Sequence, residues 1–124
     1  MVGNDLTYKI IGCAMKVHNT LGPGFKEVIY QRCLAIEFDK AGISYEREKE
    51  QKIFYDGIVV GKGRADFIVE KEVSVELKAI VNLENANIAQ AKSYTVAYDF
   101  PLGLLINFGA ESLQYKLMFN PKYQ

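Results

Sequence analysis

Two acidic residues and a lysine lie in neighbouring segments whose spacing would let them meet. Asp66 belongs to the first segment, and Glu76 and Lys78 belong to the second. If both segments are strands joined by a turn centred on Lys71, Asp66 stands directly opposite Glu76, because both positions are equally far from the centre. Side chains alternate along a strand, so Glu76 and Lys78 project from the same face.

Carboxylates in opposed positions repel each other unless a cation lies between them. Opposed Cβ atoms are only about 4.5–5.5 Å apart. Mg²⁺ suits such a pair, because it takes oxygen ligands and keeps several waters. Lys78 beside the ion would orient or activate a water, or neutralise charge developing on a transferring phosphoryl group. The spacing therefore predicts a divalent-metal site that acts on phosphodiester bonds.

Two alternatives stay open at this point. The same residues are also the pattern of a surface ion cluster, although apolar neighbours such as Phe67, Val75 and Leu77 favour buried strands. A two-residue turn would place Asp66 on the opposite face from Glu76 unless a bulge restored the register. The metal site therefore depends on a turn of odd length.

The rest of the chain predicts the elements that must position these residues. Apolar residues recur at helical spacing in the first forty positions, and the period shifts to that of strands after Gly42. Asp56-Gly57 marks a hairpin, and the continuous apolar run Leu102–Phe108 is typical of a strand covered on both faces. We expect helices at 4–21 and 25–40, strands at 44–55, 58–69 and 73–80, a helix at 83–98, and strands at 102–108 and 113–119.

This order predicts the α/β class, with a mixed sheet of about five strands flanked by three helices and the last strand at an edge. The 124 residues suit a single domain over 1–124. A formal net charge of zero argues against a protein that mainly coats nucleic acid. No signal peptide or membrane span is visible, so we expect a cytoplasmic protein. Cys13 and Cys33 lack metal-ligand spacing, so we expect free thiols, with a disulfide between the two helices as the alternative.

The ordered set of motifs resembles the PD-(D/E)XK nuclease superfamily, which has the restriction-endonuclease-like fold. Asp66 followed by Glu76-Leu77-Lys78 looks like its signature. Gly24–Tyr30 matches the Gly-x-x-Glu-x-x-Tyr motif of the GxxExxY proteins, a small prokaryotic branch. The similarity covers about 10–121 and extends through Gly63–Asp66, Val75–Ala79 and Leu104–Phe108.

The resemblance implies a role for each matching position. Asp66 and Glu76 would ligate Mg²⁺ or Mn²⁺, with the backbone carbonyl of Leu77 as a third ligand. Lys78 would be the catalytic lysine. Glu27 would bring an additional acid to the metal, directly or through water; without the resemblance, its place in the first turn of a helix would be explained by the helix dipole.

Supporting roles follow from the same resemblance. Gln90 and Tyr94 match the Gln-x-x-x-Tyr element of the RecB-like branch, and their spacing puts both on one helix face, where they could bond the lysine or a phosphate. Asn87 stands where relatives often carry histidine, so a role tied to that histidine is in doubt. Arg64 suits either a phosphate contact or an ion pair, and Tyr30 suits core packing with a tethered hydroxyl.

The expected function is hydrolysis of nucleic-acid phosphodiesters, with DNA favoured by analogy. A homodimer or a partner protein would help such a small, neutral chain to hold its substrate, and no membrane partner is expected. The alternative is a nucleic-acid-binding or regulatory module that keeps the fold with little turnover. A third possibility is a structural protein in which the acids and the lysine form a buried ion network. His18, the single histidine, suits a surface or satisfied position.

Overall fold

The computed structural model describes residues 2–124, with the side chains described from Asp5 onward. Eight elements follow in the predicted order of two helices, three strands, one helix and two strands. They are α1 (Val2–Leu21), α2 (Glu27–Ala41), β1 (Tyr45–Tyr55), β2 (Ile58–Val69), β3 (Val73–Lys78), α3 (Asn85–Ala97), β4 (Leu102–Asn107) and β5 (Gln114–Phe119).

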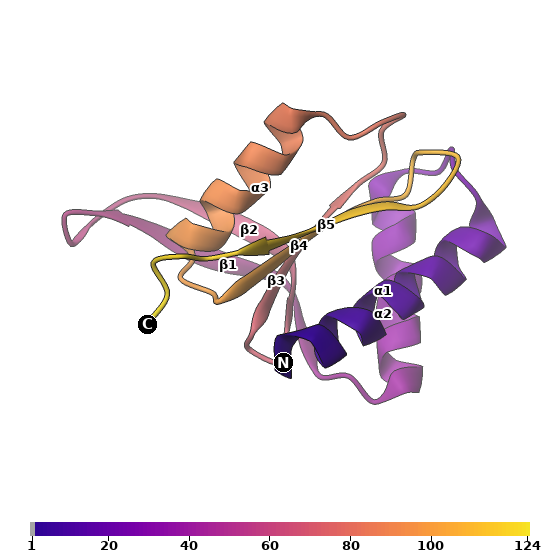
Figure 1. Cartoon of the computed structure of the whole chain (residues 1–124), viewed down its shortest axis with the longest axis horizontal. Helices are drawn as coiled ribbons and strands as arrows, with labels where there is room; N and C mark the ends of the chain where they lie inside the picture. The colour runs from indigo at the N-terminus through magenta and orange to yellow at the C-terminus, as the bar shows by residue number, and fades with distance from the viewer. Residues whose placement is uncertain (1) are drawn as a thin grey trace.

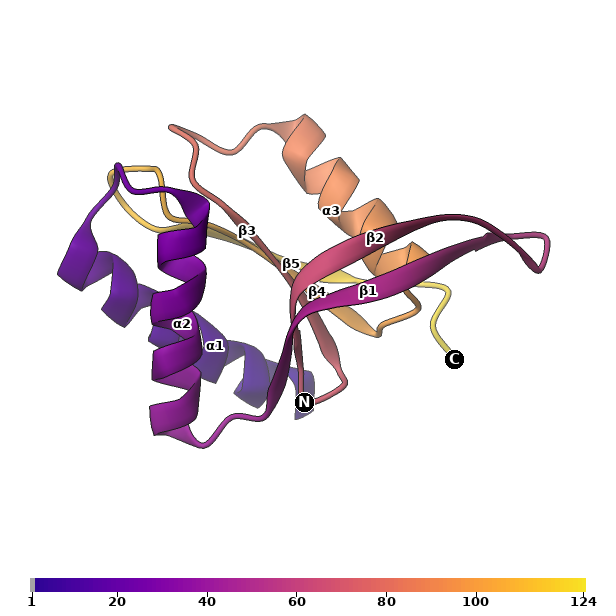
Figure 2. The ribbon, with the colours of Figure 1, turned by 180° about the vertical axis from the view of Figure 1, so that it is seen from behind.

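The helices cover the two faces of one sheet. Figure 1 shows α3 on one side of the strands and α1 with α2 on the other, and Figure 2 shows the same layers from behind. The main core lies between the sheet and the α1–α2 pair, and it includes Phe38, Phe67 and Leu104. The opposite face packs against α3 through Ala91 and Leu105. The α/β class and the mixed sheet are confirmed.

The five strands lie in sequence order across the sheet. The first three form an antiparallel meander, β3 pairs with β4 in parallel, and β5 returns antiparallel at the edge. A parallel pair needs a crossover, which α3 provides. β4 is buried along its whole length, as the apolar run predicts, because helices cover both of its faces.

Both predicted turns form. Asp56 and Gly57 have φ values of 52° and 78° and join β1 to β2 as a tight hairpin. The turn from β2 to β3 spans 70–72, and the ladder there pairs Phe67 with Val75. This register is symmetric about Lys71, so the odd-length turn is confirmed.

Side chains explain where two elements stop short of the predicted ends. β3 ends at Lys78 rather than Ile80, because the Asn107 side chain bonds the Ile80 backbone at both N (3.0 Å) and O (2.9 Å). α3 begins at Asn85 rather than Leu83, because Glu84 and Asn87 form a reciprocal capping box. Both ends are therefore set by polar side chains rather than by apolar periodicity.

The outer half of the β1–β2 hairpin extends beyond the helices (Figures 1 and 2). Its tip carries apolar side chains that stay exposed, including Phe54 (57%), Tyr55 (76%) and Ile58 (66%). We call residues 53–60 the hairpin tip. Large apolar side chains gathered on a protruding ribbon are uncommon on a solvated surface and mark a candidate contact region.

Two further expectations concern the helices and the thiols. Among residues 2–124, no helix combines the length and apolar character needed to cross a bilayer. Cys13 and Cys33 are both free and half-buried. The left-handed cap predicted at Gly42 is present, with φ of 70°, and it ends α2.

Candidate active site

Asp66 lies in a seam where β2 separates from β3. The ladder between the two strands ends at Phe67 and Val75, so continuing its register sets Asp66 opposite Glu76. Instead of a backbone bond across the seam, the Leu77 N–H donates to Asp66 Oδ2 at 2.8 Å. The side chain of Asp66 thus takes the place of a backbone hydrogen bond of the ladder and is bonded to β3.

The same seam leaves a backbone acceptor on β3. In a strand, the N–H and C=O of one residue point to the same edge. Since the Leu77 N–H points to Asp66, its carbonyl also faces the opened seam, beyond the last pair of the β2–β3 ladder. The Leu77 carbonyl therefore points to the same edge of β3 as the Asp66 carboxylate.

Three carboxyl groups around the seam repel one another. Burial first, and then the charge of Asp66, raises the pKa of Glu76 to about 8, while Lys78 lowers it and Glu27 adds a smaller rise. Burial also raises the pKa of Asp66, against the hydrogen bonds from Leu77 and Gln31, and Glu48 adds to the rise. Glu27, at the start of α2, has a pKa raised by desolvation and then by Asp66. The four predicted charged residues thus form one coupled group.

This donor set fits a hard divalent cation. Carboxylates that raise one another's pKa gain most from a positive charge among them. Within 2–124, no three His, Cys, Asp or Glu side chains are close enough to enclose a metal ion. Mg²⁺ needs no such cage, because it is usually held by one or two carboxylates and keeps several waters. Asp66, Glu76 and the Leu77 carbonyl are oxygen donors of that kind, and Glu27 is close enough for its charge to act on Asp66.

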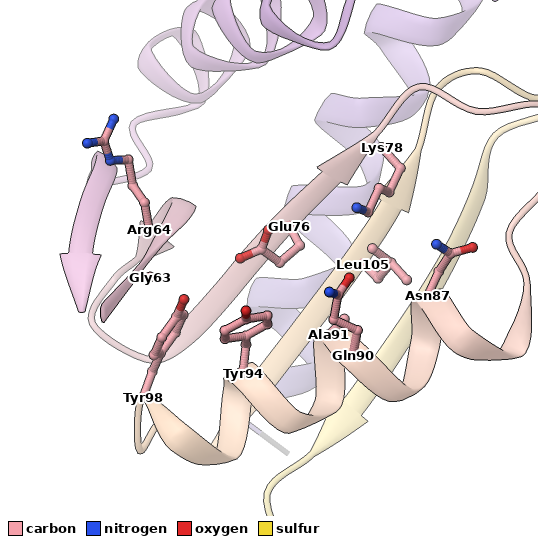
Figure 3. A pocket seen from close by; sticks show the side chains of 10 residues that line it. All are labelled: Gly63, Arg64, Glu76, Lys78, Asn87, Gln90, Ala91, Tyr94, Tyr98 and Leu105. Carbon is pink, nitrogen blue, oxygen red and sulfur yellow. The ribbon is translucent and has the colours of Figure 1, made fainter. Parts of the chain in front are cut away.

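A pocket of about 220 Å³ opens between β3 and α3, beside the seam. Glu76 and Lys78 face it from the strand, and Gln90 and Tyr94 point toward them from the helix (Figure 3). The predicted helix face is therefore the one that covers the site. Asn87 also lines the pocket, while its Oδ1 accepts the Glu84 N–H at 2.8 Å in the capping box.

Tyr98 completes the wall of the pocket and was not predicted from the sequence. It lies one helical turn beyond Tyr94, with ring centroids 5.5 Å apart. Burial, with the charge of Glu76 nearby, raises its pKa to about 12, so its hydroxyl stays protonated. Gly63 makes room for that hydroxyl, since a Cβ there would collide with it. The repeated spacing of tyrosines along α3 was the signal that could have found it.

Three other residues considered from the sequence lie outside the seam. Tyr30 is fully buried, stacks on Phe108 and bonds the Gly22 carbonyl through its hydroxyl at 2.6 Å, so it supports the loop before α2. Arg64 borders the pocket, but its guanidinium extends away from Glu76 (Figure 3). His18 is buried, and its Nε2 bonds the Ala110 carbonyl at 2.9 Å, which makes it a satisfied histidine.

Gln31 and Arg47 are the other residues that sequence reasoning missed. The amide of Gln31 donates to Asp66 Oδ1 at 3.0 Å, and Arg47 Nε donates to Gln31 Oε1 at 3.2 Å. Gln31 follows Glu27 by one helical turn, so the two share a face of α2. That spacing was available in the sequence, but nothing local indicated that the face points at Asp66.

A family model matches the sequence, and a solved structure matches the fold. A family model described as the PD-(D/E)XK nuclease superfamily matches residues 4–118. Among solved structures, the crystal structure of SSO0001 is similar with a TM-score of 0.58 and 20% identity, over 77% of this chain. The match covers 50% of that chain, so it is a likeness of fold to half of a longer protein. No curated protein matches the sequence.

Proposed function

The chain belongs to the PD-(D/E)XK nuclease superfamily, and we propose that it is a Mg²⁺- or Mn²⁺-dependent nuclease that hydrolyses DNA. The observation that carries this proposal is the seam, where the carboxylates of Asp66 and Glu76 meet beside Lys78 and the backbone of Leu77. We further assign it to the GxxExxY branch, on the motif Gly24–Tyr30, as a single domain over 1–124 in the cytoplasm.

Each residue then has a task. Asp66, Glu76 and the Leu77 carbonyl would hold the metal, with Glu27 as the additional acid. The metal would act as a Lewis acid and would lower the pKa of a bound water. Lys78 would neutralise charge that develops on the phosphoryl group.

The wall opposite Lys78 would bind the substrate. Gln90 and Tyr94 face the same pocket and would contact the phosphate that is being cleaved, while Arg64 at its border would contact a neighbouring one. Tyr98, kept protonated, would offer a hydroxyl donor rather than a negative charge there. All of these roles require the named side chains to face the pocket between the sheet and α3.

The direct test compares single- and double-stranded DNA and RNA, each incubated with Mn²⁺ or with chelator. We expect cleavage of DNA only with the metal. Asp66→Asn should lower the rate at least about 100-fold, because losing even an indirect partner of a metal costs about 10–100-fold. Asparagine still offers an oxygen to the Leu77 N–H, so the fold should survive.

Asp5→Asn in the first turn of α1 is the matched control, since it makes the same chemical change at an exposed position away from the seam and the pocket, and it should cleave like the wild type. Cleavage that persists in chelator, or in Asp66→Asn, would contradict the proposed metal site. RNA cleaved in preference to DNA would correct the substrate.

We also propose that a second copy of the chain covers the hairpin tip. An isolated two-stranded ribbon is marginally stable in water, and this one exposes apolar side chains of both strands, such as Phe54 and Ile58. A second subunit would bury them and lengthen the surface available to a nucleic acid. That would compensate for a chain with a net charge of zero.

Sedimentation velocity at rising protein concentration tests this surface. We expect a dimer that the double substitution Phe54→Ser and Ile58→Ser converts to a monomer with unchanged secondary structure. Val81→Ser is the control, because Val81 is equally apolar and 79% exposed but lies away from the tip. A wild type that stays monomeric at every concentration would overturn the proposed dimer.

A further inference from the structure

Two side-chain hydrogen bonds in series lead from the edge strand β1 to Asp66. Arg47 on β1 donates to the amide oxygen of Gln31 on α2. The amide nitrogen of Gln31 in turn donates to the carboxylate of Asp66. We propose that Gln31, oriented by Arg47, is a positioning residue that presents Asp66 to the metal. The inference rests on the proposed function, because it assigns a task within that same site.

The chemistry of the donors fixes which way the amide faces. Arginine donates hydrogen bonds and accepts none, so Arg47 must face the oxygen of the Gln31 amide. The amide nitrogen is then left to face Asp66, where an ionised carboxylate can only accept. In the flipped amide, oxygen would face carboxylate oxygen and nitrogen would face guanidinium. Arg47 therefore selects the one orientation in which Gln31 can hold Asp66.

The carboxylate of Asp66 is fixed through both of its oxygens. Gln31 donates to Oδ1, and the Leu77 N–H donates to Oδ2. One donor comes from a helix and the other from a strand, so the plane of the carboxylate cannot turn without breaking one of them. A carboxylate has about four lone-pair positions, so two donors leave acceptor capacity for a cation.

Gln31 also sets the position of Glu27. The two residues are one turn apart on the same face of α2, and Gln31 is only 4% exposed. The bond to Asp66 ties this face of α2 to the seam, which brings the additional acid within electrostatic reach of Asp66. A single amide thus aligns two of the acids, one directly and one through the helix.

The first test is Mn²⁺ affinity, measured by calorimetric titration of the metal-free protein without any nucleic acid. Gln31→Leu should weaken Mn²⁺ binding by about 10–100-fold, the usual cost of losing a partner of a ligand. Gln114→Leu is the matched control. Its amide oxygen also accepts two partly buried structural bonds, from the Leu83 N–H and from the Asn107 side chain, but it lies outside the seam. That variant should lose stability and keep its Mn²⁺ affinity.

The second test uses the sign of the Arg47 effect. If Arg47 acted only through its charge, removing it would tighten the binding of a cation. If Arg47 orients Gln31, Arg47→Met should instead weaken Mn²⁺ binding, by on the order of 10-fold or less. Lys49→Met on the same strand removes an equal charge with no contact to Gln31, and it should leave affinity equal or tighter.

The two substitutions should also be coupled. In the Gln31→Leu background, Arg47→Met should cause no further loss, because the residue it orients is gone. Wild-type affinity in Gln31→Leu would overturn the positioning role, and tighter binding in Arg47→Met would overturn the orienting role. A wild type that binds Mn²⁺ but cleaves nothing would contradict the nuclease proposal alone, whereas one that binds no Mn²⁺ would overturn both.

Discussion

Lys78→Ala is expected to lower the rate of DNA cleavage by about 100–1000-fold, the usual cost of removing one group that stabilises transition-state charge. Lys78 faces the pocket beside Glu76 and is half-buried, so no solvent ion replaces it easily. Mn²⁺ should bind as tightly or more tightly than in the wild type, because the lost positive charge opposes a cation. Rates on a labelled oligonucleotide, with a parallel Mn²⁺ titration, separate the two effects.

Lys92→Ala is the control for this experiment, since Lys92 lies on α3 but is exposed and does not line the pocket. Its cleavage rate should match that of the wild type. Unchanged cleavage by Lys78→Ala would remove the lysine from the mechanism. If the wild type cleaves none of the substrates, the binding or regulatory module becomes the better account of the fold.

Glu76→Gln is expected to stabilise the metal-free protein at high pH. The pKa of Glu76 rises from 4.5 to about 8 on folding, because burial and the charge of Asp66 penalise its ionised form. Between these values the folded state binds more protons than the unfolded state, so the stability of the wild type falls as the pH rises from about 4.5 to 8. Each pKa unit is about 1.4 kcal/mol, so the gain above pH 8 should be on the order of a few kcal/mol.

Denaturant unfolding in chelator at pH 4 and pH 9 measures this effect. The variant and the wild type should be equally stable at pH 4, where both carry a neutral side chain, and should separate at pH 9. Saturating Mn²⁺ should reverse the order, since a metal that binds only the folded wild type stabilises it by mass action. Glu111→Gln, at an exposed position, should show neither trend. Equal stabilities of the variant and the wild type at pH 9 would mean that folding does not raise the pKa of Glu76.

The register between the strands of Asp66 and Glu76 could be predicted from the sequence, given a turn of odd length, because it depends on local rules. A strand has a fixed period of two and a turn of odd length preserves the face, so counting from Lys71 predicts the register that the pair Phe67–Val75 shows. The same locality explains why the Asp56-Gly57 hairpin was predictable. Tight turns are determined by the few residues within them.

The contacts of Gln31 could not be predicted in the same way. They depend on how α2 docks against the sheet, which is set by the packing of apolar side chains such as Leu34 and Phe38 from distant parts of the chain. Periodicity identifies the buried face of a helix but not which strand that face meets. Asn107 was missed for a related reason, because the partner that it bonds at Ile80 is far away in the sequence.

The bond between the Leu77 amide and Asp66 gives this protein a spectroscopic reporter of its own site. Most amide hydrogens in a sheet are hydrogen-bonded to a neighbouring backbone carbonyl. The Leu77 amide is instead bonded to the carboxylate that we expect to bind the metal. Its chemical shift and its exchange with solvent should follow the state of Asp66, while the adjacent amide of Lys78 sits on the β4 side of the strand. A single resonance can therefore be watched during titration with a diamagnetic cation such as Mg²⁺, before any substrate has been identified.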